Sequence, residues 1–215
     1  MTEMPQSLIN GIELTFTAPG HEPLWQKLAE RDPEEVAAQA RVKWIGRRDF
    51  VVPLLGSDYF FSGDERRIIG PPNRLEPDRR VALSLLNYLA GANEAGLSGR
   101  LVPEKVLPGG DRFFSGTHAL ARRPILEAYG RAGADFLEKA ASLGAEIVAD
   151  EADSFSFQLR LLPKVPVQVT LCEDDEEFPA ELYYAFDAAT AEQIPLGILS
   201  ALVGLLNDQL AARRL

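Results

Sequence analysis

The hydrophobic pattern changes its period several times along the chain, and this limits the folds that the chain can adopt. Residues 22–30 and 33–40 have a helical pattern, and Asp32, Pro33 and Glu35 mark the start of the second helix. The next apolar runs are short, rich in β-branched and aromatic residues, and separated by glycines, at residues 41–45, 50–55, 59–61 and 66–69. We expect these runs to form an antiparallel meander. Pro53 lies inside the second run, which predicts an edge strand or a bulge there.

Helical periodicity returns after residue 77, where apolar residues recur at spacings of three and four. Residues 101–110 have the composition of a loop, and a long helical stretch is predicted from residue 113 to residue 143. Alternating polar and apolar residues then predict strands at residues 145–148, 155–161 and 165–171. Residues 181–186 favour either a further strand or the start of a helix. Residues 194–213 have the pattern of an amphipathic C-terminal helix.

These elements predict the α+β fold class, with small antiparallel sheets packed against helices and an amphipathic C-terminal helix. We expect a single domain, residues 1–215, with a helix pair and meander at residues 22–70 and a second region at residues 80–210. A chain of 215 residues with 46% hydrophobic content can bury a sizeable core without disulfides or a structural metal.

Several features indicate a cytoplasmic protein. No stretch approaches the roughly 20 apolar residues that a membrane span needs, and residues 1–10 lack the basic region of a signal peptide. The single cysteine, Cys172, fits a reducing compartment. We therefore expect cytoplasmic localisation and no membrane partner.

The excess negative charge is concentrated in one part of the chain. The chain carries a formal charge of −10, and residues 149–187 hold ten acidic and two basic side chains. Runs of basic residues are no longer than short, scattered pairs, whereas binding to nucleic acid needs lysines and arginines gathered on one face. We therefore expect no nucleic-acid partner. An acidic region attracts cations, amines or a basic protein surface.

The strongest local anomaly is the run Glu173-Asp174-Asp175-Glu176-Glu177, directly after a predicted strand. Carboxylates this close repel one another, so a positive partner would stabilise them. A second acidic group, at residues 150–153, precedes the neighbouring strand. If the two strands pair through a hairpin loop at residues 162–164, both acidic groups meet at one edge of the sheet.

Oxygen ligands of this kind suit a divalent cation, Mg²⁺ or Ca²⁺, although the spacing is not that of an EF-hand loop. The candidate metal ligands are Asp153, Glu173, Asp175 and Glu177. The same residues also fit a solvated acidic turn or a surface that recognises a basic protein.

Other arrangements for catalysis carry less weight. The chain contains two histidines, His21 and His118, and neither accompanies a catalytic motif. Cys172 ends a strand beside the acidic run, where nearby negative charge would weaken it as a nucleophile, so we expect a buried strand cysteine there. The segment 108–111 lacks the lysine of a phosphate-binding loop and is predicted to form a tight turn.

The C-terminal half resembles the uncharacterised bacterial and archaeal family of unknown function DUF3786 over about residues 80–210. The resemblance is carried by short blocks: Leu107-Pro108-Gly109-Gly110 with Phe113 or Phe114, Leu143-Gly144, Asp153-Ser154, Leu162-Pro163-Lys164-Val165-Pro166-Val167, Asp175-Glu176-Glu177-Phe178-Pro179 and Phe186-Asp187. Some relatives join this domain to a four-cysteine iron–sulfur module, which implies an iron–sulfur or corrinoid protein as a partner. With Cys172 alone, this chain cannot hold an iron–sulfur cluster of that kind.

The leading hypothesis is a non-catalytic binding or accessory protein whose acidic edge binds a cofactor, a cation or a protein partner. One alternative is an enzyme in which the carboxylate cluster holds a divalent metal. A second alternative is a structural scaffold whose acidic turn contributes only solubility. The sequence leaves open whether the chain is an enzyme, which ligand it takes and which oligomeric state it adopts.

Overall fold

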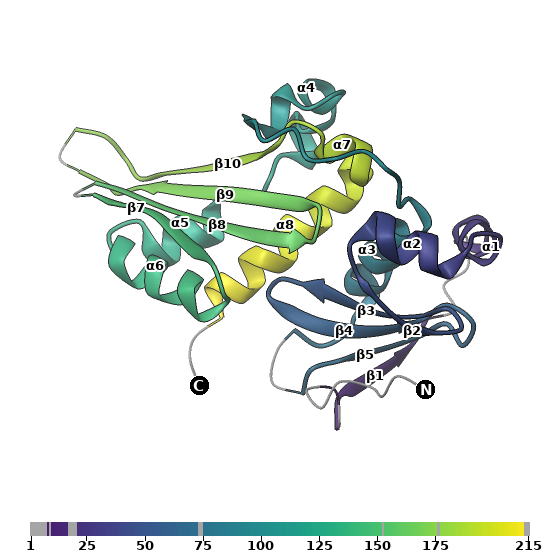
Figure 1. Ribbon diagram of the computed structural model, residues 1–215. Coiled ribbons are helices and arrows are strands. Elements are labelled where there is room, and N and C mark those ends of the chain that lie inside the picture. Colours follow the sequence, from purple (N-terminus) through teal and green to yellow (C-terminus); the bar gives the residue numbers. More distant parts are fainter. Residues whose placement is uncertain are drawn as a thin grey trace.

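The first half of the chain builds an antiparallel sheet, here called sheet A (Figure 1). The structure is a computed structural model that describes residue 8 and residues 10–16, 21–72, 75–151, 153–175 and 177–212. In spatial order the strands of sheet A are β1 (Ile12–Thr15), β5 (Arg67–Gly70), β4 (Ser57–Ser62), β3 (Asp49–Leu54) and β2 (Lys43–Gly46). The predicted meander is therefore confirmed, and β1 is a strand that the sequence analysis missed.

Pro53 predicts an edge strand or a bulge, but β3 is not an edge strand over its whole length, because it lies between β4 and β2. Strand β2 pairs with β3 only as far as Val51, and Pro53 lies beyond that point, opposite Asp58 of β4. Pro53 therefore has a neighbouring strand on one side only, which explains why a residue without an N–H group is tolerated there.

Three helices accompany sheet A: α1 (Glu22–Ala29), α2 (Pro33–Ala40) and α3 (Arg79–Ala90). The side chain of Asp32 accepts a hydrogen bond from the Glu35 backbone at the start of α2 (2.9 Å), and Asp78 does the same for Val81 at the start of α3 (2.9 Å). Helix α3 packs against α1, α2 and the C-terminal helix. It therefore links the two halves of the molecule.

The second half builds another antiparallel sheet, sheet B. In spatial order its strands are β6 (Leu101–Pro103), β10 (Glu181–Asp187), β9 (Val165–Cys172), β8 (Ser154–Leu162) and β7 (Glu146–Glu151). Along β9 the side chains alternate strictly between buried and half-buried, as expected for a strand with one face toward the core. The predicted hairpin turn at residues 162–164 is confirmed. Residues 181–186 form a strand, the first of the two alternatives for this segment. Strand β6 replaces part of the loop that was expected at residues 101–110.

The helices of the second half are α4 (Gly110–Phe113), α5 (Arg123–Tyr129), α6 (Gly133–Ser142), α7 (Thr190–Gln193) and α8 (Leu196–Ala211). The expected continuous helix over residues 113–143 is wrong, because it is divided into α5, α6 and short single turns. Gly116 has φ +67°, Pro124 lies in the first turn of α5, and Gly130 caps the end of α5. Each of these residues interrupts or limits a helix.

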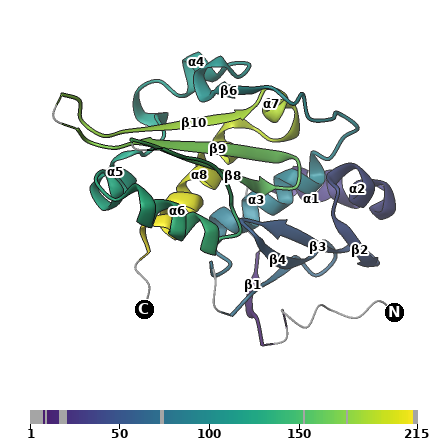
Figure 2. The ribbon, with the colours of Figure 1, turned by 60° about the vertical axis from the view of Figure 1, so that its left-hand side comes forward.

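Helix α8 runs along one face of sheet B on the same side as α5 and α6, which is clearest in Figure 2. The predicted C-terminal helix is thus confirmed over residues 196–211, and Arg213 lies outside the described residues. Buried side chains from both sheets, from α3 and from α8 form one continuous hydrophobic core. The chain therefore has the predicted α+β architecture.

No helix in the described part of the chain is both long and apolar enough to cross a membrane.

Candidate functional site at the acidic end of sheet B

The two acidic groups predicted to meet do so at one end of sheet B. Ser154 pairs with Cys172 across β8 and β9, and the backbone N–H of Glu173 donates to the carbonyl oxygen of Asp153 (3.0 Å). An open depression of about 420 Å³ lies there, and it is lined by carboxylates together with a thiol and an aromatic ring: Glu151, Asp153, Glu173, Asp175, Glu181, Cys172 and Phe178. We call this depression the acidic depression.

The backbone of the acidic segment is fixed by the turn between α5 and α6. The N–H of Asp174 donates to the carbonyl oxygen of Gly130 (2.8 Å), and the Asp174 carboxylate pairs with Arg131 (2.8 Å). The Glu173 carboxylate accepts a hydrogen bond from the N–H of Gly133, the first residue of α6. A carboxylate at this position is stabilised by the positive end of the helix dipole. Part of the acidic run therefore serves the local structure.

Asp175 organises the turn that follows. Its carboxylate oxygen Oδ1 accepts hydrogen bonds from the N–H groups of Glu177 (2.8 Å) and Phe178 (2.6 Å). Its own N–H donates to the carbonyl oxygen of Phe178 (3.0 Å). These bonds fix Glu177 and Phe178 relative to Asp175, whereas Glu176 lies outside the described residues.

The four predicted metal ligands therefore differ in whether their carboxylates already accept hydrogen bonds. Glu173 and Asp175 already accept backbone hydrogen bonds, whereas Asp153 and Glu177 are exposed and form no side-chain hydrogen bond or ion pair with another described residue. Within the described ranges, no group of three or more histidine, cysteine, aspartate or glutamate residues is arranged to hold a metal ion. A divalent-cation site at these four residues stays a prediction.

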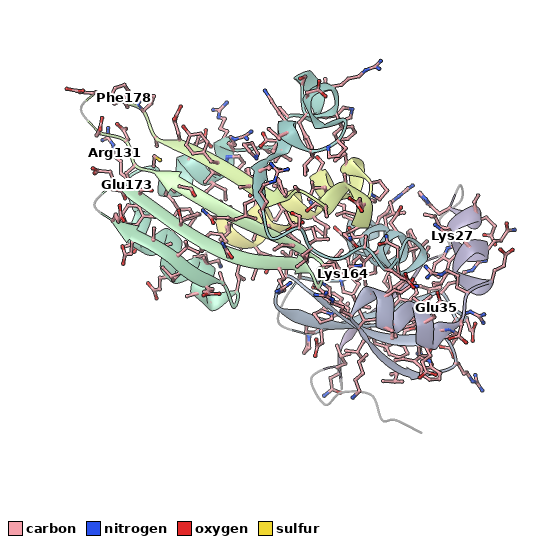
Figure 3. The ribbon with its side chains drawn as sticks, turned by 45° about the horizontal axis from the view of Figure 1, so that its top comes forward. Lys27, Glu35, Arg131, Lys164, Glu173 and Phe178 are labelled. Atoms are coloured by element: carbon pink, nitrogen blue, oxygen red, sulfur yellow. The ribbon has the colours of Figure 1, made fainter. Side chains whose placement is uncertain are left out.

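Apolar side chains stand exposed around this acidic end. Phe178 is 66% exposed, Tyr183 on β10 is 49% exposed, and Val148 on the edge strand β7 is 49% exposed. Figure 3 shows Phe178 at the far tip of the sheet, close to Glu173 and Arg131. The sequence indicated the acidic residues but carried no signal that Phe178 would be exposed rather than buried.

Cys172 at the end of β9 is half-buried and belongs to the wall of the acidic depression, so the expected buried cysteine is only partly covered. The two histidines stack on aromatic rings, His21 on Phe16 and His118 on Phe113.

Two sequence blocks behind the family resemblance have structural explanations. Gly109 has φ +75°, and a Cβ atom on Gly110 would lie 2.1 Å from the carbonyl oxygen of Glu104, so the 108–111 segment is the expected tight turn. Asp187 is 2% exposed, and its carboxylate accepts N–H bonds from Ser98, Gly99 and Ala189 (2.8–2.9 Å). Burial raises the pKa of Asp187, but these backbone hydrogen bonds outweigh it and lower the pKa overall.

The sequence analysis missed one charged residue of note, Lys164 in the β8–β9 turn. Lysines in short hairpin turns are usually exposed, but Lys164 is 2% exposed. Its position against α3 is created by the packing of the two halves, so the local sequence contains no sign of it.

Comparisons with known proteins identify the family of the chain. No curated protein and no solved structure shows a significant match. A family profile described as a domain of unknown function, DUF3786, matches residues 32–208. The match extends beyond the 80–210 region in which the resemblance was expected and includes α2, the meander strands β2–β5 and most of α8. This protein is therefore a member of the DUF3786 family.

Proposed function

We propose that this protein is a non-catalytic binding protein, and that the acidic end of sheet B docks a basic surface of a partner protein with Phe178 as its apolar anchor. The observation that carries the proposal is the exposure of Phe178, 66%, on a turn that Asp175 holds in place. An aromatic side chain already held in one backbone position loses little freedom on binding, and such residues are typical anchors of protein interfaces.

The surrounding charge favours a basic partner. The acidic depression contains carboxylates from β7, from Asp153 between β7 and β8, from the 173–177 segment and from β10. Arg131 pairs with Asp174 of this segment, but its side chain is 80% exposed, so the pair contributes little to stability. The remaining carboxylates give a negative potential that attracts lysine and arginine side chains and repels phosphates.

The apolar residues extend this surface beyond the depression. Phe178 lies at its rim, Tyr183 follows on β10, and Val148 lies on β7, which has a partner strand in sheet B on one side only. An interface of this type combines an apolar centre with a charged rim. An iron–sulfur or corrinoid protein, which the family resemblance suggests, fits the proposal only if it presents a basic face. The single cysteine supports a cytoplasmic setting for this interaction.

The test uses a short lysine-rich peptide carrying one leucine as a probe, and the same peptide with glutamates in place of the lysines as its control. We expect the basic peptide to shift the backbone NMR signals of Cys172, Phe178 and Glu181, and to bind less tightly when salt rises from about 50 to about 300 mM. The acidic peptide should not bind. Phe178→Ala should weaken binding of the basic peptide roughly tenfold, because aromatic anchors typically contribute more than about 1 kcal/mol.

The matched control is Val106→Ala, which removes another exposed apolar side chain, 59% exposed, away from the acidic end. Binding that is unchanged by Phe178→Ala, or equal for both peptides, would overturn the proposal. Titration with Mg²⁺ and Ca²⁺ in place of the peptide covers the cation alternative. Saturable shifts of the same signals by the metal, with no response to the basic peptide, would replace the docking function with the predicted metal site.

A further inference from the structure

A second region of interest lies at the opposite end of sheet B, where the β8–β9 turn meets the N-terminal helices. Figure 3 shows Lys164 at this junction, far along the sheet from Glu173 and Phe178. A pocket of about 330 Å³ opens there between the end of α2, the segment 93–95 and the turn. Its wall includes both Lys164 and Arg41.

Lys164 is buried without a charged partner. Its side-chain Nζ donates to the carbonyl oxygen of Asn93 (2.9 Å), which satisfies one of its three N–H donors. No carboxylate among the described residues forms an ion pair with it. Lysine is almost never fully buried unless it is paired, because moving an ammonium group out of water is costly.

The position of Lys164 is fixed by the surrounding helices. Its backbone N–H donates to the hydroxyl of Tyr88 on α3 (3.2 Å), and that hydroxyl donates to the carbonyl oxygen of Ala40 at the end of α2 (2.6 Å). Another wall residue, Gln39, is held by hydrogen bonds from Arg31 (2.5 Å) and to Glu35 (2.7 Å). The pocket is therefore built from residues that the fold holds in place.

Arg41 adds a second positive charge. It follows Ala40, is exposed, and forms no ion pair with a described residue. Burial, and then the charge of Arg41, lower the pKa of Lys164. A bound anion would stabilise the ammonium form against both effects. Arg160 lines an adjoining depression together with Arg41 and Glu146, and it likewise forms no ion pair with a described residue. Positive charges thus gather in this corner of a chain whose formal charge is −10.

We propose that Lys164 and Arg41 bind the phosphate group of a small phosphorylated molecule in this pocket. A phosphate monoester carries close to two negative charges and several acceptor oxygens, which match one ammonium and one guanidinium group. Glu94 also lines the pocket, and its carboxylate would repel a ligand that is negative along its whole length. The ligand is therefore one phosphate on an uncharged or positively charged body.

The test uses inorganic phosphate as the probe, added to the full chain at constant ionic strength, with chloride and acetate as the comparison anions. We expect phosphate to shift the backbone NMR signals of Arg41, Asn93 and Lys164 in a saturable manner, with smaller effects from acetate and none from chloride. Lys164→Met should weaken phosphate binding roughly tenfold or more, as expected for the loss of a charged hydrogen-bond donor. Lys27→Met, at an exposed lysine of α1, is the matched control and should leave binding unchanged.

Arg41→Gly provides a second variant if Lys164→Met does not fold. Arg41 is exposed and its backbone has φ +55°, a conformation that glycine adopts readily, so we expect this variant to fold and to lose affinity for phosphate. The proposal is overturned if phosphate causes no saturable shift, or if both variants bind as tightly as the natural chain. Acetate binding as tightly as phosphate would also overturn it, because the site would then recognise a carboxylate.

Discussion

The backbone N–H of Leu55 donates a hydrogen bond to the carbonyl oxygen of Leu161 (3.1 Å), and this bond joins the tip of the β3–β4 hairpin to strand β8. The hairpin turn consists of Leu55 and Gly56, which both have positive φ (49° and 72°). Leu55 is 4% exposed, so the turn is wedged against sheet B rather than solvated. The two halves of the molecule are therefore connected by backbone geometry as well as by the hydrophobic core.

Gly56→Ala is expected to lower the free energy of unfolding by about 3 kcal/mol, through the positive φ and an overpacked contact. A Cβ atom at Gly56 would lie 2.2 Å from the carbonyl oxygen of Leu143. Gly99→Ala is the control, because Gly99 has the same φ of 72° but no atom within 4 Å of an added Cβ. Gly99→Ala should lower the free energy of unfolding by only about 1 kcal/mol. Equal losses in urea unfolding of the two variants would contradict this account of the junction.

Asp187→Asn is expected to lower the free energy of unfolding by about 2–3 kcal/mol at pH 7, because an amide oxygen replaces a charged acceptor of several N–H groups. The pKa of Asp187 is lower in the folded protein than its ordinary value near 3.9. The contribution of the Asp187 carboxylate to stability is therefore complete above about pH 4, and it is lost as the pH falls through the pKa that Asp187 has in the folded protein.

Urea titrations of wild type and Asp187→Asn between about pH 7 and about pH 3 measure this dependence. The difference in the free energy of unfolding between wild type and Asp187→Asn should stay constant as the pH falls to about 5, and it should shrink below about pH 4. Asp111→Asn, at an exposed aspartate of α4, should show a negligible difference throughout. A difference that grows at low pH would mean that Asp187 does not act as a charged acceptor.

Arg122→Met is expected to cost about 3 kcal/mol, because it leaves Glu104 buried without its partner. The guanidinium group of Arg122 pairs with the Glu104 carboxylate (2.5 Å), whose side chain is 6% exposed, and also donates to the carbonyl oxygen of Leu182 (2.8 Å). The adjacent residue Arg123 is 87% exposed in its pair with Glu127, so Arg123→Met should cost less than about 0.5 kcal/mol. Thermal unfolding of Arg122→Met and Arg123→Met compares the two losses of stability, and a double variant that combines Arg122→Met with Glu104→Gln is measured alongside them. The double variant should recover part of the loss.

Arg41→Gly is expected to raise the free energy of unfolding by about 0.5–1 kcal/mol, because Arg41 ends α2 in the left-handed conformation that glycine prefers. Glu30→Gly is the control at the end of α1, where φ is −80° and glycine offers no such relief. It should be destabilising by a similar amount. If Arg41→Gly lowered stability instead, Arg41 would have a structural role that its exposed position does not indicate.

The local pattern of the sequence was sufficient to predict most elements. Asp32, Pro33 and Glu35 predicted the start of α2, and strict alternation over residues 165–171 predicted β9, because both signals act within a few residues. The short strands β1 and β6 were missed, since each is defined by its pairing with a distant strand, β5 and β10 respectively. The break between α5 and α6 was also missed, although Gly130 and Gly133 lie there.

Part of the candidate site could also be predicted from local sequence patterns. The hairpin predicted at residues 162–164 brought Asp153 and Glu173 together, because pairing register transmits the position of a turn along both strands. The sequence by itself determined the α+β class, the acidic segment and this meeting of carboxylates. Only the tertiary structure decided that Phe178 is exposed and that Lys164 is buried, because burial depends on surfaces supplied by residues far away in the chain.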